Sequence, residues 1–337
     1  MNIVCAGSVA YDYIMHFPGR FSEHILPDHI ETLSVSFLVD SMRRERGGNA
    51  ANIAHNLRLL GEHPRVMATV GQDFDSYREW LEAHGIDTSL IKEIEDEFTA
   101  SFFVSTDEDN RQIASFYTGA MAYAGRVSFY DLDPDSIAIA IISPNDPGAM
   151  VQYVRECREL GIPYIYDPSQ QIVRLSPEEL VKGIAGSLIF IVNDYECSLV
   201  KRKAGLSDAD IQDLVNTVIV TCGEKGSYIM VEGRRIDIPA VPPRRNVDPT
   251  GVGDAYRAGL IAGYLRGYPW ETTGRIGALA AAYVLEETGT QNHEYTLDEF
   301  AERYRENFGD APEVDELRRG GNRSEDMRKE TECLPRH

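Results

Sequence analysis

The strongest structural signal in this 337-residue chain is the segment Asn246-Val247-Asp248-Pro249-Thr250-Gly251-Val252-Gly253-Asp254-Ala255-Tyr256-Arg257-Ala258-Gly259. Pro249 and the two glycines that follow it specify a turn. Behind the turn, small residues recur at the i, i+3, i+4, i+7, i+8 spacing of one helix face: Ala255, Ala258, Gly259, Ala262 and Gly263. We therefore predict a helix whose thin face lets its N-terminus lie close against a sheet.

The backbone amides from Gly251 to Asp254 are predicted to form an anion-binding cradle. The first N–H groups of a helix have no partner within the helix, and they lie at the positive end of its dipole. Such a cradle suits the charge on a phosphoryl group during transfer. Asp254 itself allows two interpretations, a common first-turn or N-cap residue, or a general base placed beside a phosphate.

Short apolar runs alternate with helical patterns along most of the chain. The expected strands are residues 3–6, 65–70, 137–143, 164–166, 188–192, 218–221 and 227–231. The expected helices are residues 50–60, 74–84, 147–160, 177–185, 208–216, 254–266, 270–287 and 297–308. This alternation predicts an α/β fold with a mainly parallel central sheet flanked by helices on both faces.

Three further runs, residues 34–39, 100–106 and 112–117, read as strands without a helix between them. The last two are joined by the polar turn 107–110, which favours a hairpin. We interpret these runs as a small β-sheet lid, made of residues 12–45 and 98–120 inserted in an α/β body of residues 1–312. The alternative is an antiparallel edge of the main sheet.

The composition excludes several classes of protein. The chain has 33 basic and 54 acidic residues and a net charge of −21, which argues against nucleic-acid binding. No apolar run is long enough to span a bilayer and the N-terminus does not resemble a signal peptide, so we expect a cytoplasmic protein. The five cysteines have no metal-ligand spacing. In residues 313–337 the apolar pattern ends, and we expect a charged, disordered tail.

The string Asp-Pro-Thr-Gly-Val-Gly-Asp at residues 248–254 resembles the second signature of the ribokinase-like PfkB family of carbohydrate kinases. In that family the final Asp accepts the proton of the acceptor hydroxyl, and the turn before it is an anion hole. The resemblance implies that Asp254 is the catalytic base and that Gly251, Val252 and Gly253 form the hole. Val252 stands where alanine is usual, which matters little because backbone amides form the hole.

The segment 46–57 has two glycines before a helical pattern and resembles the first signature of the same family, G-G-x-x-x-N. The resemblance implies that Gly47, Gly48 and Asn52 hold ribose hydroxyls. It also implies that Asp12, which follows the first strand, binds the sugar diol. Taken alone, the glycine pair and this Asp would more often be turn residues.

The nucleotide side of the expected site depends on weaker patterns. Asn193 and Glu196 are similar to the family's N-x-x-E element, in which the Glu organises Mg²⁺, although both residues are also common helix caps. Residues 221–226 are similar to a T-x-G-x-x-G turn that lines the nucleotide cleft. The implied nucleotide contacts are Asn193, Thr221, Gly223, Gly226, Arg174 and Asn292. ATP and Mg²⁺ are the implied cofactors, with a monovalent cation such as K⁺ as a further candidate.

Five strings, at residues 17–22, 36–40, 167–171, 193–196 and 287–291, resemble the bacterial adenosine kinase branch of the family. A purine needs flat apolar walls and a few amides at its edge. The resemblance implies contacts to the nucleoside from Ser8, Asp12, Gly48, Asn52, Phe102, Phe116, Met121, Gln170 and Gln171. It also implies a homodimer through the lids, in which Ser36 reaches the neighbouring site and Phe37 and Val39 are candidates for the buried face.

The expected activity is therefore ATP-dependent phosphorylation of the 5′-hydroxyl of adenosine, a step of purine salvage. Three alternatives stay open. The chain could be a sugar kinase acting on ribose or fructose, or a kinase of another nucleoside such as guanosine or inosine. It could also be a catalytically silent relative that only binds a ligand. Aromatic residues on the lid and the Gln pair count against a bare sugar.

Overall fold

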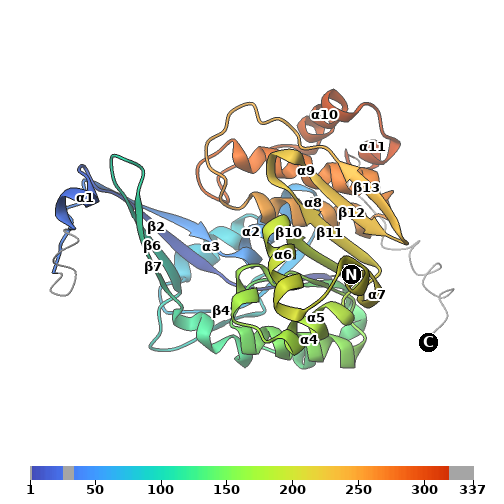
Figure 1. Ribbon diagram of the computed structural model, residues 1–337, viewed down its shortest axis with the longest axis horizontal. Helices are drawn as coiled ribbons and strands as arrows, with labels where there is room; N and C mark the ends of the chain where they lie inside the picture. Colours follow the sequence, from blue (N-terminus) through green and yellow to red (C-terminus); the bar gives the residue numbers. More distant parts are fainter. Residues whose placement is uncertain (1, 26–33, 319–337) are drawn as a thin grey trace.

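Two separate β-sheets organise the protein (Figure 1). The structure is a computed structural model, and it describes residues 2–25 and 34–318. The large sheet lies in the body of the molecule, and the small sheet projects from it as a narrow lid. The pieces expected as a lid thus do not form an edge of the main sheet.

The main sheet has nine strands in the order β13-β12-β11-β10-β9-β8-β1-β4-β5. Their bounds, in chain order, are β1 Asn2–Ala6, β4 Pro64–Val70, β5 Ile91–Glu93, β8 Ile137–Ile142, β9 Tyr164–Tyr166, β10 Ile189–Asn193, β11 Thr217–Thr221, β12 Ser227–Val231 and β13 Arg234–Ile238. All pairings from β5 to β11 are parallel, and β12 and β13 extend the sheet antiparallel. The predicted mainly parallel sheet is confirmed.

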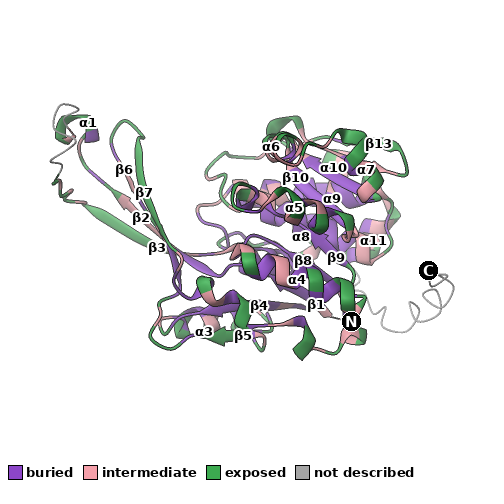
Figure 2. Ribbon diagram, turned by 60° about the horizontal axis from the view of Figure 1, so that its bottom comes forward, coloured by how far each residue is buried: buried purple, intermediate pink, exposed green. Residues whose placement is uncertain are grey.

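Helices cover both faces of this sheet, as predicted (Figure 2). One face packs against α2 Asn49–Leu59, α3 Asp75–Ala83, α8 Val252–Leu265, α9 Trp270–Leu285, α10 Leu297–Phe308 and α11 Pro312–Arg318. The other packs against α4 Pro147–Leu160, α5 Pro177–Ala185, α6 Asp194–Ala204 and α7 Asp208–Leu214. Strand β1 shows why, because Ile3 and Cys5 point into the first core and Val4 and Ala6 into the second.

The face of small residues on α8 packs only partly as expected, because one of its residues contacts a helix instead of the sheet. Ala255 and Ala258 lie in the core, as expected for a helix against a sheet. Gly259 instead faces α9, and a Cβ on it would lie 2.6 Å from the Cα of Gly277. The two helix backbones therefore touch, and this contact holds the N-terminus of α8 in a defined place.

The lid sheet has the strand order β3-β2-β6-β7, with β2 Ala10–His16, β3 Ser41–Gly47, β6 Ala100–Thr106 and β7 Gln112–Tyr117. Strands β6 and β7 are the predicted hairpin. The strand expected at residues 34–39 is wrong, because this segment forms no strand and Phe37 packs against Phe17 and Phe21 at the lid tip. A short helix, α1 Phe21–His24, belongs to the same tip.

The expected disordered tail is wrong in its first residues. Helix α11 includes residues 312–318, and its Val314 and Leu317 are fully buried in the core. Two apolar side chains three positions apart are enough to dock this charged segment. The rest of the expected tail, residues 319–337, lies outside the described residues. None of the helices in the described part of the chain is long and apolar enough to cross a membrane.

Candidate functional site

Two cavities meet at the N-terminus of α8, and Asn49, Gly251 and Asp254 line both. The first cavity, of about 560 Å³, is lined by Ser8, Ala10, Asp12, Gly48, Asn49, Asn52, Phe102, Phe116, Thr118, Met121, Pro144, Gln170, Gln171, Arg174, Thr250, Gly251, Asp254 and Thr290. The second, of about 490 Å³, is lined by Asn49, Ser169, Asn193, Asp194, Tyr195, Glu196, Thr221, Gly223, Gly251, Gly253, Asp254 and Arg257. The structure thus brings together most of the residues that the sequence singled out, from distant parts of the chain.

Within the described residues, the backbone amides of Gly251, Gly253 and Asp254 have no hydrogen-bond acceptor, whereas the amide of Val252, which was expected in the anion hole, is already bonded. Gly251 adopts a left-handed conformation with φ of 80°, which favours glycine. The amide of Val252 bonds to the carbonyl of Pro249 at 3.4 Å, and that of Ala255 bonds to the carbonyl of Gly251 at 3.0 Å. The amides of Gly253 and Asp254 between them have no hydrogen-bond acceptor within the described residues. The first turn of α8 is therefore free to bind an anion.

Asp254 is buried between the cavities, with 6% of its surface exposed. Its carboxylate does not cap α8. Nδ2 of Asn49 donates to Oδ1 at 3.1 Å, and Nδ2 of Asn52 donates to Oδ2 at 2.8 Å. Burial raises the pKa of Asp254, while Arg257 and the two asparagines act in the opposite direction. A carboxylate with a raised pKa at a shared cavity wall has the properties of a general base.

The two asparagines are themselves oriented by hydrogen bonds. The hydroxyl of Ser8 donates to Oδ1 of Asn49 at 3.2 Å, which leaves Nδ2 of Asn49 for Asp254. Oδ1 of Asn52 accepts from Oγ1 of Thr290 at 2.8 Å and from Nε2 of Gln291 at 2.7 Å. Ser8 and Asn52, both expected as ribose contacts, therefore also position the carboxylate of Asp254.

Sequence reasoning missed the parts played by Asn49, Thr290 and Gln291. All three lie in strings that the sequence analysis quoted, and Asn49 and Gln291 are each next to a residue with an assigned role. Gln291 continues the network, because its Nε2 donates to the hydroxyl of Tyr77 at 2.5 Å, which donates to the carbonyl of Gly47 at 3.0 Å. The only sequence signal for these three residues was that each is a polar side chain in a signature string and had no assigned role.

Asp12 is partly buried at the lid end of the first cavity. Burial, together with the neighbouring carboxylates of Asp248 and Glu45, raises the pKa of Asp12 to about 6. The lack of a side chain at Gly47 makes room for it, since a Cβ there would lie 2.7 Å from Oδ2 of Asp12. Gly48 begins α2 with φ of 94°, a conformation that favours glycine.

The lid and the body supply different groups to the first cavity. Phe102 on β6 and Phe116 on β7 are direct cross-strand partners, and both line it. Met121 and Gln171 are buried in its wall, with 5% and 7% exposed. Oε1 of Gln170 accepts from Ser169 at 3.0 Å, whereas the side-chain amide of Gln171 has no partner in the described part of the protein.

The second cavity contains the residues expected on the nucleotide side. Asn193 and Glu196 cap α6 reciprocally, with both bonds at 2.8 Å, and Oε1 of Glu196 also accepts from Ser169 at 2.9 Å. Glu196 also lines the second cavity. No group of three His, Cys, Asp or Glu residues able to hold a metal occurs in residues 2–25 and 34–318. Glu196 fits Mg²⁺ only if water and phosphate oxygens complete the coordination.

Six predicted residues lie outside the cavity expected for them, and two of these, Gly47 and Val252, are direct neighbours of lining residues. Arg174 lines the first cavity rather than the second. Asn292 lines neither, and its Nδ2 donates to Glu45 and to the carbonyl of Thr288. Ser36 lies in the exposed segment before β3. Gly226 is outside both cavities, where its φ of 86° shapes the turn between β11 and β12.

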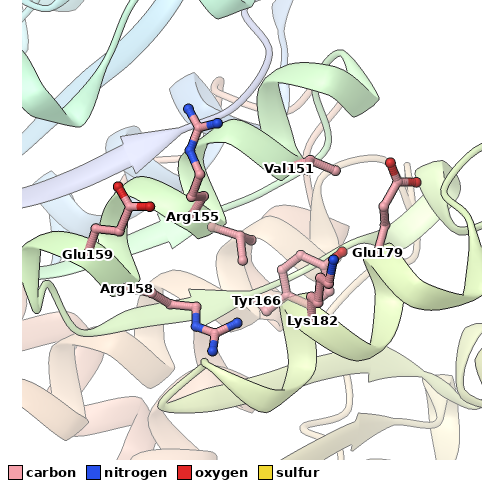
Figure 3. A pocket seen from close by; sticks show the side chains of 8 residues that line it. Val151, Arg155, Arg158, Glu159, Tyr166, Glu179 and Lys182 are labelled. Atoms are coloured by element: carbon pink, nitrogen blue, oxygen red, sulfur yellow. The ribbon is translucent and has the colours of Figure 1, made fainter.

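A third hollow, of about 490 Å³, lies on the outer surface between α4 and α5. Figure 3 shows Arg155 and Arg158 on α4, Glu179 and Lys182 on α5, and Tyr166 between the helices. It contains none of the residues predicted to be functional. We therefore take the two cavities at α8 as the candidate active site.

Comparison with known proteins identifies the family. The chain matches the pfkB family of carbohydrate kinases over residues 2–296. The chain belongs to this family.

Two nucleoside kinases are similar to this pfkB-family protein over nearly its whole length. The solved structure of the Burkholderia thailandensis nucleoside kinase in complex with inosine matches with a TM-score of 0.82 and 37% identity, covering 93% of this chain and 99% of that one. The nucleoside kinase of Methanocaldococcus jannaschii is 31% identical over 306 residues, 90% of this chain and 96% of that protein. The adenosine kinase of Sinorhizobium meliloti shares the fold, with a TM-score of 0.68 and 21% identity over 86% of this chain and 95% of that one.

The hydrogen bonds from α2 predict how the Asp254 carboxyl titrates. Asn49→Ala removes a hydrogen bond to the ionised carboxylate, so the pKa of Asp254 should rise further above its ordinary value. The measurement is a pH titration of ¹³C-labelled aspartate carboxyl signals, with Asp254→Asn to assign the resonance. Asn307→Ala, a distant change on α10, serves as the control. A pKa that is unchanged or lower in Asn49→Ala would contradict the proposed role of this asparagine.

Proposed function

We propose that the protein is a nucleoside kinase that transfers the γ-phosphoryl group of ATP to the 5′-hydroxyl of purine nucleosides. The observation that carries this proposal is the buried Asp254, which stands between two cavities and next to the free amides of α8. One cavity has the groups that a nucleoside needs, and the other has those that a triphosphate needs. The site lies where the two substrates of a phosphoryl transfer would meet.

The comparisons favour a broader choice of nucleoside than the expected adenosine. The relatives at 31% and 37% identity are nucleoside kinases, one of them in complex with inosine, whereas the adenosine kinase shares the fold at 21% identity. The open alternative of a guanosine or inosine kinase is therefore better supported than adenosine alone. We include adenosine as one acceptable purine nucleoside, and a role in purine salvage follows from such an activity.

The proposed reaction is one in-line displacement. The 5′-oxygen of the nucleoside forms a bond to the γ-phosphorus, the bond from that phosphorus to ADP breaks, and the hydroxyl proton passes to Asp254. The amides of Gly253 and Asp254 bind the charge on the moving phosphoryl group. Glu196 would hold Mg²⁺, which neutralises phosphate charge when bound. A monovalent cation such as K⁺ remains part of the proposal, without assigned ligands.

The first cavity suits a purine nucleoside better than a bare sugar. Asp12 offers a carboxylate for the ribose diol, and Phe102 and Phe116 offer ring faces for a base. A bare sugar would leave both rings without a partner. The free amide of Gln171 can donate through Nε2 or, after rotation, accept through Oε1, so it can bond to a 6-amino or a 6-oxo group.

The assignment of the base predicts the effect of Asp254→Asn. This variant keeps the shape of the side chain but cannot accept a proton, so kcat should fall by about 10²–10⁴-fold while nucleoside binding persists. A coupled ADP-release assay with a panel of nucleosides and sugars measures turnover, and calorimetry measures binding. Asp208→Asn, at the exposed start of α7, is the control. Turnover of Asp254→Asn within threefold of wild type would reject the assignment.

The rotation of Gln171 predicts a specificity switch. In Gln171→Glu the carboxylate can only accept, so it should favour the amino group of adenosine and repel the oxo group of inosine. We expect the ratio of kcat/KM for adenosine over inosine to rise about tenfold or more. Gln171→Met, which removes both bonding modes, should lower both values and leave their ratio nearly constant. A ratio that moves less than twofold in Gln171→Glu would contradict base recognition by this residue.

We also propose a homodimer through the lids, with a different contact face from the one first expected. Phe37 is engaged within its own lid tip. By strand alternation, the lid face turned away from the first cavity carries Tyr13, Phe103, Met42 and Ile113, of which Met42 is 62% exposed. An exposed apolar face on a narrow projecting sheet favours association with a second copy.

Light scattering at micromolar concentration should give about twice the 37.7 kDa mass of the chain. Ile113→Asp should shift it toward the monomer, because a charge on this face opposes burial. Val247→Asp, at an exposed apolar residue near the turn before α8, should leave the mass unchanged. A monomeric wild type would reject the dimer and any contribution of Ser36 to a neighbouring site.

A further inference from the structure

Arg257 is a buried cation one turn beyond Asp254 on α8, and it lines the second cavity. Only 8% of its surface is exposed. Among the described residues that line this cavity it is the only cation, and Asp194, Glu196 and Asp254 are acidic. The family signatures quoted above give this position no role, and no part of the proposed function uses it.

Asp167 holds the guanidinium of Arg257 in one orientation. Nη2 of Arg257 donates to Oδ1 of Asp167 at 2.6 Å, and Nε lies 2.5 Å from Oδ2. Asp167 is fully buried directly after β9. Burial raises its pKa to about 7, and the attraction of Arg257 opposes that shift. A two-point contact between a planar guanidinium and a carboxylate fixes the plane of both groups.

The third guanidinium nitrogen is left for another partner. Nη1 has no hydrogen-bond acceptor within the described residues. It lies against the anion-binding turn, because a Cβ placed on Gly253 would be 2.6 Å from Nη1. The glycine thus makes room for the guanidinium directly beside its own free amide. Nη1 is not among the fully buried side-chain atoms, so it can donate to a ligand in the second cavity.

Charge shows which ligand fits. A nucleoside triphosphate is strongly anionic, and the chain carries a net charge of −21. Arg257 interacts with the carboxylates of Asp167, Asp254 and Glu196. Among the described residues that line the second cavity, it carries the one positive charge. We propose that Nη1 of Arg257 binds the phosphoryl group in transfer, together with the amides of Gly253 and Asp254, and that Asp167 is the positioning residue that aims it. This inference rests on the proposed kinase function.

The test distinguishes phosphoryl binding by Arg257 from the contribution of its ion pair with Asp167 to folding. Arg257→Gln alone would leave Asp167 buried without its cation, so the decisive protein is the double variant Arg257→Gln with Asp167→Asn, in which two amides replace the ion pair. We expect it to fold, with a melting temperature near that of wild type. Its kcat should fall by about 10²-fold or more, and its KM for the nucleoside should change little. Arg202→Gln, on the surface of α6, is the matched control.

Chemical rescue provides a readout that a purely structural residue would not affect. Guanidinium ions at millimolar concentration should restore part of the turnover of Arg257→Ala, because they can occupy the vacated space beside Gly253. They should not stimulate Asp254→Asn or wild type. A folded double variant with kcat within threefold of wild type would overturn the proposal, as would an Arg257→Ala protein that guanidinium fails to stimulate.

A wild-type protein without kinase activity would reject the proposed function, but Arg257 can still be tested. In that case calorimetry compares the affinity of wild type and double variant for ATP with Mg²⁺. A dissociation constant at least tenfold higher in the double variant supports a phosphate contact from Arg257. Equal constants, or no binding of ATP by wild type, would overturn it.

Discussion

Two side-chain amides from α2 bind the two carboxylate oxygens of Asp254 on α8. A buried carboxylate is costly unless hydrogen bonds satisfy it, so this contact selects one relative placement of the two helices. Helix α2 follows lid strand β3, and α8 follows the turn at Gly251. The same two hydrogen bonds therefore fix the position of the first cavity relative to the turn at Gly251. Asn49, Gly251 and Asp254 line both cavities, so a change at any of the three alters the wall of both.

The network behind this contact joins four distant parts of the chain. Ser8 follows β1, Asn52 lies on α2, Tyr77 on α3, and Gln291 follows α9. Each group orients the next, so that the donors and acceptors of Asn52 have defined partners. Buried hydrogen-bond networks of this kind rigidify a site, because breaking any one bond leaves a buried polar atom unsatisfied. The general base that we propose needs such rigidity, since small displacements from the reacting hydroxyl are costly.

The electrostatics of the site are local rather than global. A chain with a net charge of −21 opposes the approach of an anionic substrate. The proposed anion site would compensate with the free amides of the turn, the positive end of α8 and the guanidinium of Arg257. These groups are buried, where charge interactions are screened less than at the surface. The acidic surface and the anion-binding centre are therefore compatible in one molecule.

The sequence by itself determined the α/β body, the parallel sheet and the position of the glycine turn before α8. Strands such as β8 are continuous apolar runs buried on both faces. The turn before α8 is specified by its glycines. Both patterns can be recognised from short stretches of sequence alone. Only the tertiary structure decided the rest. Strand β3 is charged and exposed, and it is a strand because β2 pairs with it. Asn49 and Arg257 matter through contacts with residues 205 and 90 positions away, Asp254 and Asp167, and such contacts exist only after the chain has folded.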